Sequence, residues 1–72
     1  MSNSYQTNTK VKWEWGNGSA TGYVRNIYRE EITKTLKGSE VTRKGSKSDP
    51  AYLIEQSDGD EVLKLNSELE KA

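Results

Sequence analysis

Two runs of alternating residues on either side of a Gly-rich turn constrain the fold of this chain most. Val11, Trp13 and Trp15 alternate with charged residues, which is the pattern of a half-buried β-strand. Residues 16–19 interrupt the pattern with residue types that tolerate positive φ, as a tight turn requires. The alternation then resumes in residues 20–25. The stretch predicts a β-hairpin that carries both tryptophans of the chain.

The second predicted strand, residues 20–29, changes phase along its length. Ala20, Gly22 and Val24 share one face, whereas Ile27 falls on the other. A phase change inside a strand is typical of a β-bulge or a sharp bend, and Gly22 provides the conformational freedom for it.

Residues 30–37 predict a third, weaker strand, in which Ile32 and Leu36 share a face. The polar and basic segment 41–49 predicts a long loop, with Val41 in at most a short extended piece. Loops of this length are uncommon in small domains and are often functional.

The last third of the chain predicts two more strands and a helical turn. Pro50 suits the first residue of a strand, which continues through residues 51–56. The Asp-Gly pair within residues 57–60 fits a type I′ turn and leads to a fifth strand, residues 61–65. Residues 66–69 resemble a single helical turn, capped by its Asn or Ser and plugged by its Leu.

These elements predict an all-β domain, a small five-stranded SH3-like barrel with a C-terminal single helical turn. Closure into a barrel removes the exposed strand edges of a small sheet, and an open five-stranded sheet is the alternative. The domain spans residues 10–70. The almost wholly polar residues 1–9 predict a disordered N-terminal tail.

Composition excludes several classes of function. The 72 residues suffice for one domain and include no Cys and no His, which removes disulfides, the commonest zinc ligands and the usual general base. We therefore expect no enzyme, no metal site and no cofactor. There is no secretory signal and no apolar run of membrane-spanning length, so a cytoplasmic, monomeric protein is expected.

Charge is unevenly distributed along the chain although its formal sum is zero. Residues 1–48 hold nine Lys or Arg against four Glu, whereas residues 49–72 hold two Lys against seven Asp or Glu. This asymmetry either marks a binding surface or is neutralised when the two parts fold together. We favour neutralisation, because charge along a sequence says little about the fold.

Motifs spread over residues 10–70 resemble, in their order, the Tudor domain family of hypervirulence-associated proteins. The resemblance implies a Tudor-like, SH3-like barrel of bacterial or fungal type, but it implies no ligand, because fold does not carry function. The matching motifs are Val11-Lys-Trp13, Gly18-x-Ala20-x-Gly22-x-Val24, Lys37-Gly38, Val41-x-Arg43, Asp49-Pro50-Ala51-Tyr52-Leu53-Ile54, Gly59, Val62-Leu63-Lys64 and Ser67-Glu68-Leu69.

An aromatic cage for a methylated lysine or arginine is the sharpest hypothesis for a site. Such a cage needs several ring faces around one cation and a nearby carboxylate. Trp13 and Tyr52 are better explained as core residues, since large aromatics dominate the cores of small domains. Trp15 is the ring most expected to be exposed, followed by Tyr28. The full candidate set is Trp13, Trp15, Tyr23, Tyr28 and Tyr52, with Asp58, Asp60 or Glu61 as the anion.

Nucleic-acid binding is an alternative hypothesis, in which clustered Lys and Arg contact phosphates and Trp15 or Tyr23 stacks on bases. The zero formal charge and the pI near 6.2 argue against it and favour a solvated surface. The candidate cations are Arg25, Arg29, Lys34, Lys37, Arg43, Lys44 and Lys47.

The sequence thus predicts a non-catalytic binding module. Its first expected partner is a protein or peptide, held between the Trp15 turn and the basic loop 37–49, because SH3-like domains use aromatic-lined grooves in this way. Nucleic acid, bound by the basic face of the second and third strands together with that loop, is the second expected partner. The predicted ligand-binding residues are Trp15, Tyr23, Tyr28, Arg25, Arg29, Arg43, Lys44 and Lys47.

Overall fold

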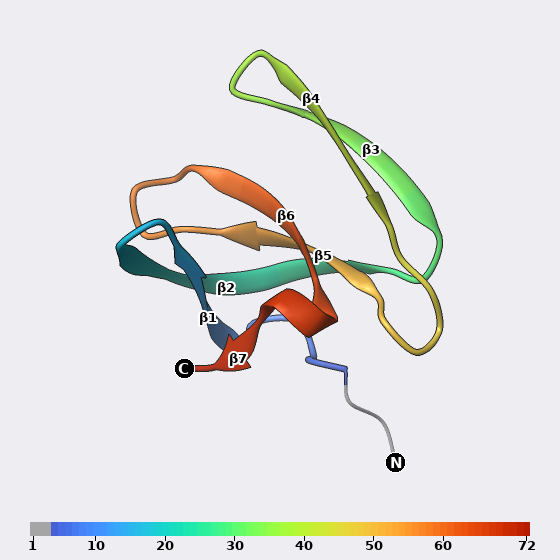
Figure 1. Ribbon diagram of the computed structural model, residues 1–72, viewed down its shortest axis with the longest axis horizontal. Helices are drawn as coiled ribbons and strands as arrows, with labels where there is room; N and C mark the ends of the chain where they lie inside the picture. The colour runs from blue at the N-terminus through green and yellow to red at the C-terminus, as the bar shows by residue number, and fades with distance from the viewer. Residues whose placement is uncertain (1–3) are drawn as a thin grey trace.

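The computed structural model describes residues 4–72, and nearly all of their regular structure is β-strand (Figure 1). Among these residues, the helical structure is one turn of 3-10 helix, η1 (Asn66–Glu68). The predicted all-β class and C-terminal helical turn are therefore confirmed. The strands are β1 (Lys10–Trp15), β2 (Gly18–Tyr28), β3 (Glu31–Leu36), β4 (Ser39–Lys44), β5 (Ala51–Glu55), β6 (Glu61–Leu65) and β7 (Glu70–Lys71).

Five strands form one antiparallel sheet in the order β6–β5–β2–β1–β7, and β3 and β4 pair separately as a two-stranded ribbon. In the described part of the chain no strand pairing joins the ribbon to the sheet, so the strands are not closed into a hydrogen-bonded barrel. The predicted closure of the strands into a barrel is therefore corrected. β1 pairs with residues 18–23 of β2 and β5 pairs with residues 23–28, whereas β3 pairs only with β4. The ribbon instead folds over the sheet and meets β6 (Figure 1).

The segment 41–49, expected to be a loop, begins within a strand. β4 pairs with β3 across a two-residue turn, in which Lys37 and Gly38 have φ angles of 51° and 77°. Positive φ at both central residues is the pattern of a type I′ turn, which matches the twist of paired strands. This strand could not be predicted from its composition, because residues 41–44 are mostly polar. A two-stranded ribbon with one solvent-exposed face needs few apolar residues.

The turn between β5 and β6 differs from the predicted type I′ turn. Gly59 has a φ of 89°, but Asp58 does not have a positive φ. The residues between the two strands, 56–60, also make a longer loop than a type I′ hairpin has. The Asp58 carboxylate accepts a hydrogen bond from the backbone N–H of Asp60 (3.0 Å) and so supports this longer loop.

The phase change predicted inside β2 is a β-bulge. The pairing of β2 with β5 shifts register between Val24 and Asn26, so that Ile27 returns to the side of the core. Gly22 has a second role, in close packing. A Cβ atom at Gly22 would lie 2.6 Å from Cγ2 of Ile54 and 2.7 Å from the carbonyl oxygen of the following residue. Only glycine lets β2 approach β5 this closely.

The main core covers one face of the sheet, and its aromatic members are Trp13 and Tyr52, which are 4% and 0% exposed. Their burial agrees with the prediction that these two rings fill the core. Leu69 follows the η1 turn and packs in the same cluster, as predicted for the apolar residue of this helical turn. The buried cluster consists of Val11, Trp13, Val24, Tyr52, Ile54 and Leu69.

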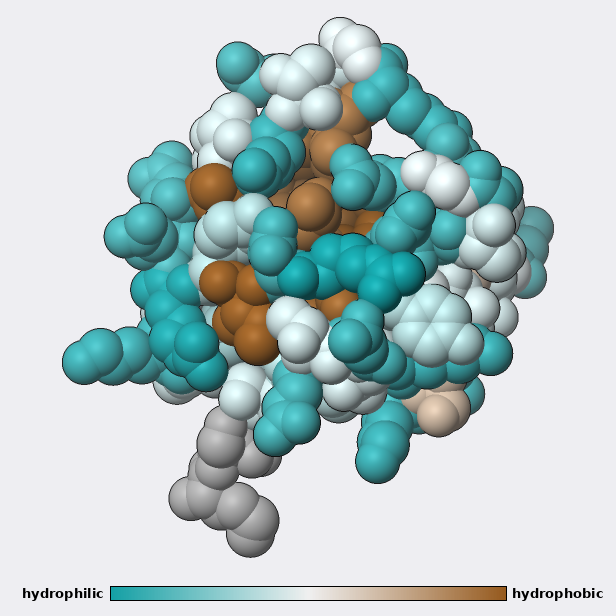
Figure 2. All heavy atoms as spheres, turned by 180° about the vertical axis from the view of Figure 1, so that it is seen from behind, coloured by the Kyte–Doolittle hydropathy of each residue, from teal (hydrophilic) through white to brown (hydrophobic). Residues whose placement is uncertain are grey.

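A second apolar layer lies on the other face of β5 and β6. Leu53 and Leu63 are buried there, whereas Ile32, Leu36 and Val41 of the ribbon are only half-buried. Seen from behind, apolar atoms are visible in separate areas between polar side chains rather than as one continuous surface (Figure 2). The apolar side chains of the ribbon therefore remain partly exposed, although Leu53 and Leu63 of the sheet are buried.

The segment before β1 differs from the predicted disordered tail at the residues that the structure describes; residues 1–3 lie outside them. Tyr5 packs against the main core, and its ring meets that of Tyr52 edge-on, with 5.7 Å between the centroids. The backbone N–H of Asn8 donates to the carbonyl oxygen of Val24 (2.6 Å). One aromatic residue in a polar segment has no periodic pattern, so the sequence could not predict this docking.

The expected side-chain cap of the helical turn is also absent from residues 66–68. Leu65 occupies the N-cap position, and its backbone N–H donates to Oε1 of Glu68 (2.8 Å). The side chain of Asn66 instead accepts a hydrogen bond from the hydroxyl of Tyr52 (2.9 Å). Asn66 thus ties the helical turn to the core rather than capping it.

Candidate binding surface

Trp15 is the most exposed large hydrophobic residue of the described chain, with 60% of its surface accessible. It continues the alternation of Val11 and Trp13 and therefore lies on the core side of β1. The core does not extend so far along the strand, because β7 pairs only with the first half of β1. The indole ring instead lies beside Gly18, its partner across the turn, where a Cβ would be 3.8 Å from Cζ2.

A hollow of about 440 Å³ lies between the second half of β1 and the segment that joins η1 to β7. Its apolar part is formed by two largely buried side chains, Trp13 and Leu69. Its remaining residues are polar or acidic, namely Glu14, Ser67, Glu68 and Glu70. The hollow thus combines an apolar floor with an excess of carboxylates.

A wider hollow of about 710 Å³ adjoins the N-terminal segment, η1 and β7. Tyr52 is the centre of a hydrogen-bond network beside it. The backbone N–H of Tyr5 donates to the Tyr52 hydroxyl (2.8 Å), and that hydroxyl donates to Asn66 (2.9 Å). Burial is the main reason that the pKa of Tyr52 is raised above its ordinary value. The two bonds fix the segment and the helical turn to the core, so we assign this network a structural role.

The predicted aromatic site residues do not come together. Tyr23 is paired with Lys10 across β1–β2, so it lies on the opposite face of the hairpin from Trp13 and Trp15. Tyr28 lies beyond the bulge, where the ammonium group of Lys34 is 5.5 Å from its ring centroid. Among residues 4–72, no ring–ring contact joins Trp15, Tyr23 and Tyr28.

The acidic candidates for the cage lie in the β5–β6 turn, and one of them is already paired. A carboxylate oxygen of Asp60 is 2.6 Å from Nζ of Lys37 at the tip of the ribbon. This hydrogen-bonded ion pair lowers the pKa of Asp60 and raises that of Lys37. It connects the ribbon to the β5–β6 turn. Asp58 of the same turn and Glu61, the first residue of β6, are both exposed.

Two of the predicted basic site residues are held by acidic partners. Arg25 donates from Nε to Glu55 (2.9 Å) and from Nη1 to Asn8 (2.7 Å), and its guanidinium lies 5.9 Å from the Tyr23 ring centroid. Nε of Arg43 lies 3.5 Å from a carboxylate oxygen of Glu68. These contacts support the expectation that opposite charges from the two parts of the chain meet in the fold.

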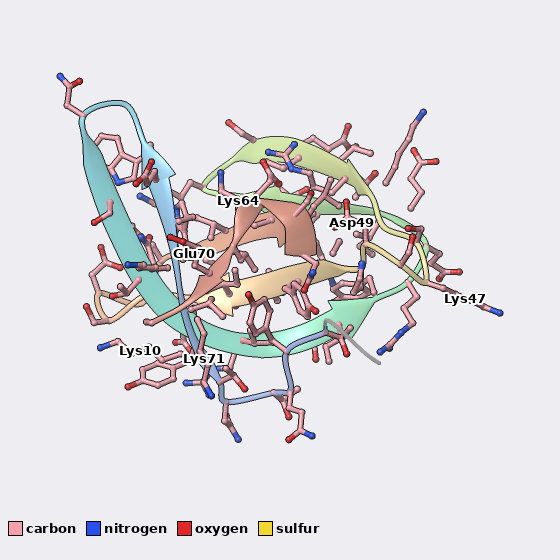
Figure 3. All side chains as sticks on the ribbon, turned by 60° about the horizontal axis from the view of Figure 1, so that its bottom comes forward. Lys10, Lys47, Asp49, Lys64, Glu70 and Lys71 are labelled. Atoms are coloured by element: carbon pink, nitrogen blue, oxygen red, sulfur yellow. The ribbon has the colours of Figure 1, made fainter. Side chains whose placement is uncertain are left out.

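The other three predicted basic residues, Arg29, Lys44 and Lys47, are exposed and form no ion pair among residues 4–72. Lys47 lies at the end of the molecule opposite the β1–β2 turn (Figures 1 and 3). The predicted peptide surface comprises the Trp15 turn and the basic loop 37–49, and Lys47 of that loop is therefore far from the turn, whereas residues 39–44 of it form β4.

The described residues include neither a cluster of metal ligands nor a membrane-spanning helix. No group of three or more acidic, His or Cys side chains comes together there as a metal site requires. No helix in that part of the chain has the length and apolarity needed to span a membrane.

Comparison with known families identifies the domain. The model of the Tudor domain of hypervirulence-associated proteins matches residues 9–69. The chain belongs to this family. Its Tudor-like fold is that of a small binding module, and this fold is typically non-catalytic. No curated protein and no solved structure matches the chain significantly.

Proposed function

We propose that this Tudor-like domain is a non-catalytic module that binds a peptide segment of another protein at the Trp15 hollow, defined as Trp15 and the hollow beside Trp13 and Leu69. The observation that carries the proposal is the 60% exposure of Trp15, which directly follows Trp13 and Glu14, two residues that line the hollow. Exposed tryptophans beside desolvated pockets dominate the binding energy of many protein interfaces. Aromatic-lined grooves of small β-domains bind extended peptides in the same way.

The residue types at the Trp15 hollow support binding rather than catalysis. The chain has no His and no Cys, and Ser67 is the only hydroxyl residue that lines the hollow. One side-chain oxygen of Glu68, Oε1, is already engaged, since it accepts the N–H of Leu65 and lies near Arg43. A peptide ligand requires only shape, apolar area and charge at this surface.

A display library of random peptides, selected on the folded domain, tests the proposal. We expect the selected peptides to move the NMR signals of Trp13 to Trp15 and of Ser67 to Glu70. Trp15→Ala is expected to abolish selection and binding, because it removes the exposed ring. Tyr23→Ala is the matched control, since Tyr23 is an exposed aromatic (42%) on the opposite face of the same hairpin. Equal loss in both variants, or binding unaffected by Trp15→Ala, would overturn the proposal.

Nucleic-acid binding is the second candidate function, and one observation favours it. Arg29, Lys44 and Lys47 form no ion pair among the described residues, so their charges are available for phosphates. Glu30 follows Arg29 in the chain and Glu31 pairs with Lys44 across β3–β4, and both weaken the positive field. Fluorescence anisotropy with single- and double-stranded DNA and RNA tests this function. Binding that falls with salt and with Lys44→Ala plus Lys47→Ala would support it, and salt-independent or absent binding would exclude it.

A further inference from the structure

The two edges of β1 are occupied differently. Trp15 and Gly18 flank a two-residue turn, so they form a hydrogen-bonded pair, and Val11 and Trp13 direct their backbone groups toward β2 in the same way. Because these groups alternate along a strand, the N–H and C=O groups of Lys10, Lys12 and Glu14 point to the opposite edge.

β7 covers only part of this opposite edge. The carbonyl oxygen of Lys10 accepts the N–H of Ala72 (3.1 Å), and Lys12 is paired with Glu70. The chain before β7 does not continue this pairing, because it forms the η1 turn. Within residues 4–72 the backbone of Glu14 therefore has no strand partner at this edge. Figure 1 shows β7 beside the start of β1, with the β1–β2 turn extending away from it.

The space beside the open edge is the hollow already described. It is lined by Trp13 and Glu14 of β1 and by the residues that precede β7, so it lies where a strand in line with β7 would run. Exposed Trp15 follows Glu14 in the chain and lies on the core side of the sheet. β1 thus combines an unpaired backbone edge at Glu14, an open hollow beside it and an exposed apolar side chain, Trp15. Binding of an added strand requires these three features.

The charge around the edge indicates the chemistry of the partner. Glu14, Glu68 and Glu70 line the hollow. The nearest basic group to Glu70 is Lys12, at 4.0 Å and with both side chains about half exposed or more, which makes a weak pair. Glu14 has no ion-pair partner among the described residues. A partner strand that carries positive side chains would complement this surface.

We infer that an extended segment carrying Lys or Arg adds to the sheet at the open edge of β1. Its backbone hydrogen-bonds the N–H and C=O of Glu14, and one of its side chains packs on Trp15. The inference rests on the proposed peptide-binding function and specifies how the peptide is held. It also explains why Trp15 lies at the end of β1 where the edge is uncovered.

A blocked hexapeptide of alternating valine and lysine is the probe, and hydrogen exchange of individual amides is the measurement. We expect the Glu14 amide to become protected, while the Lys12 amide, already bonded to β7, changes little. Glu14→Pro removes the N–H at the edge, where proline is tolerated, and is expected to lower affinity by about tenfold or more. Ser19→Pro is the matched control, because Ser19 pairs with Glu14 and directs its backbone to the other edge of the hairpin.

A second form of the probe makes the test independent of the proline variant's folding. A hexapeptide N-methylated at the positions that face β1 keeps the side chains but cannot form the strand bonds, and we expect it to bind about tenfold more weakly or not at all. Equal binding of the methylated peptide would overturn strand addition. Equal binding of a valine–glutamate hexapeptide would overturn the requirement for positive charge.

The outcomes separate this inference from the proposed function. Peptide binding that needs Trp15 but is unaffected by methylation or by Glu14→Pro would overturn strand addition and leave the peptide-binding function intact. Binding that is unaffected by Trp15→Ala would overturn both. Protection of the Glu14 amide that increases with protein concentration without any peptide would show that a second copy occupies the edge, which also overturns the inference.

Discussion

The β1–β2 and β3–β4 hairpins are both closed by two-residue turns, but only the first is part of the main sheet. β1 and β2 pair with β7 and β5, whereas β3 and β4 pair with no further strand in the described chain. Val11 and Val24 of the first hairpin are fully buried, and Ile32 and Val41 of the ribbon are only half-buried. The comparison shows that a turn is sufficient to form a hairpin, whereas burial depends on which strands become its neighbours.

The ribbon is attached to the rest of the molecule mainly through side chains. Its tip is paired through Lys37 with Asp60, and Arg43 lies near Glu68. Ion pairs near the surface are screened by solvent and contribute little to stability. We therefore expect the first hairpin to unfold with the core and the ribbon to open more easily.

The largest expected contrast comes from truncating one isoleucine in each layer. Ile54→Ala, at a 0% exposed position, is expected to lower the free energy of unfolding by about 2–5 kcal/mol. Ile32→Ala in the ribbon removes a half-buried side chain and is expected to cost about 1 kcal/mol. Urea unfolding measures both. Should Ile54→Ala fail to fold, Ile54→Val (about 0.5–1.5 kcal/mol) replaces it; a larger loss for the ribbon variant would refute the comparison.

Gly22→Ala tests the close packing of the first hairpin on β5. The added Cβ would lie 2.6 Å from Ile54 and 2.7 Å from a backbone oxygen, so we expect a loss of about 1–3 kcal/mol in unfolding free energy. Gly18→Ala is the control in the same strand, since its Cβ would meet only the Trp15 ring at 3.8 Å. We expect that variant to remain within about 0.5 kcal/mol of the wild type. Similar losses at both glycines would mean that strand propensity, not packing, is responsible.

Tyr52→Phe tests how the N-terminal segment is held on the main sheet. It removes the hydroxyl that binds Tyr5 and Asn66, at an expected cost of about 1 kcal/mol. The Asn8 amide, bonded to β2, is expected to exchange its hydrogen faster, whereas the ribbon amides are unchanged. Tyr23→Phe is the control, since Tyr23 is 42% exposed. Unchanged exchange at Asn8 would contradict the proposed role of the network.

The smallest effect is expected from the ion pair at the ribbon tip, and it depends on pH. Because the pKa of Asp60 is lowered in the fold, its ionised carboxylate stabilises the fold above pH 3.8, the ordinary pKa of this group. This contribution is lost as the pH falls through the pKa of Asp60 in the fold. Because the pKa of Lys37 is raised in the fold, its ammonium group stabilises the fold below pH 10.5, the ordinary pKa of this group. This contribution is lost as the pH rises through the pKa of Lys37 in the fold. Lys37→Met should therefore destabilise the ribbon between these limits and have no effect in acid.

Hydrogen exchange of β3 and β4 amides at neutral pH and near pH 2 measures the ion-pair effect. Lys47→Met is the control, because Lys47 forms no ion pair among residues 4–72. The same destabilisation at both pH values would mean that Lys37 acts through its turn conformation, with its φ of 51°, rather than through its charge.

Most of the strands could be predicted from the sequence because their signals are local. The bounds predicted for β6 are those of the structure, and the phase change at Ile27 correctly indicated the bulge in β2. The family could also be identified from motifs spread over the chain. β4 was missed, since its residues are mostly polar and its strand pairing depends on the turn at Lys37 and Gly38.

The sequence by itself determined the all-β class, the β1–β2 and β5–β6 hairpins and the exposure of Trp15, because alternation and turn residues act over a few neighbouring positions. Only the tertiary structure decided which strands became neighbours, since pairing between distant segments depends on edges that are free once the earlier strands have paired. It thereby placed Tyr23 on the opposite face from Trp15, docked Tyr5 on the core and left the edge at Glu14 uncovered. The candidate site is therefore a property of the fold as a whole, although its most exposed residue could be identified from the sequence.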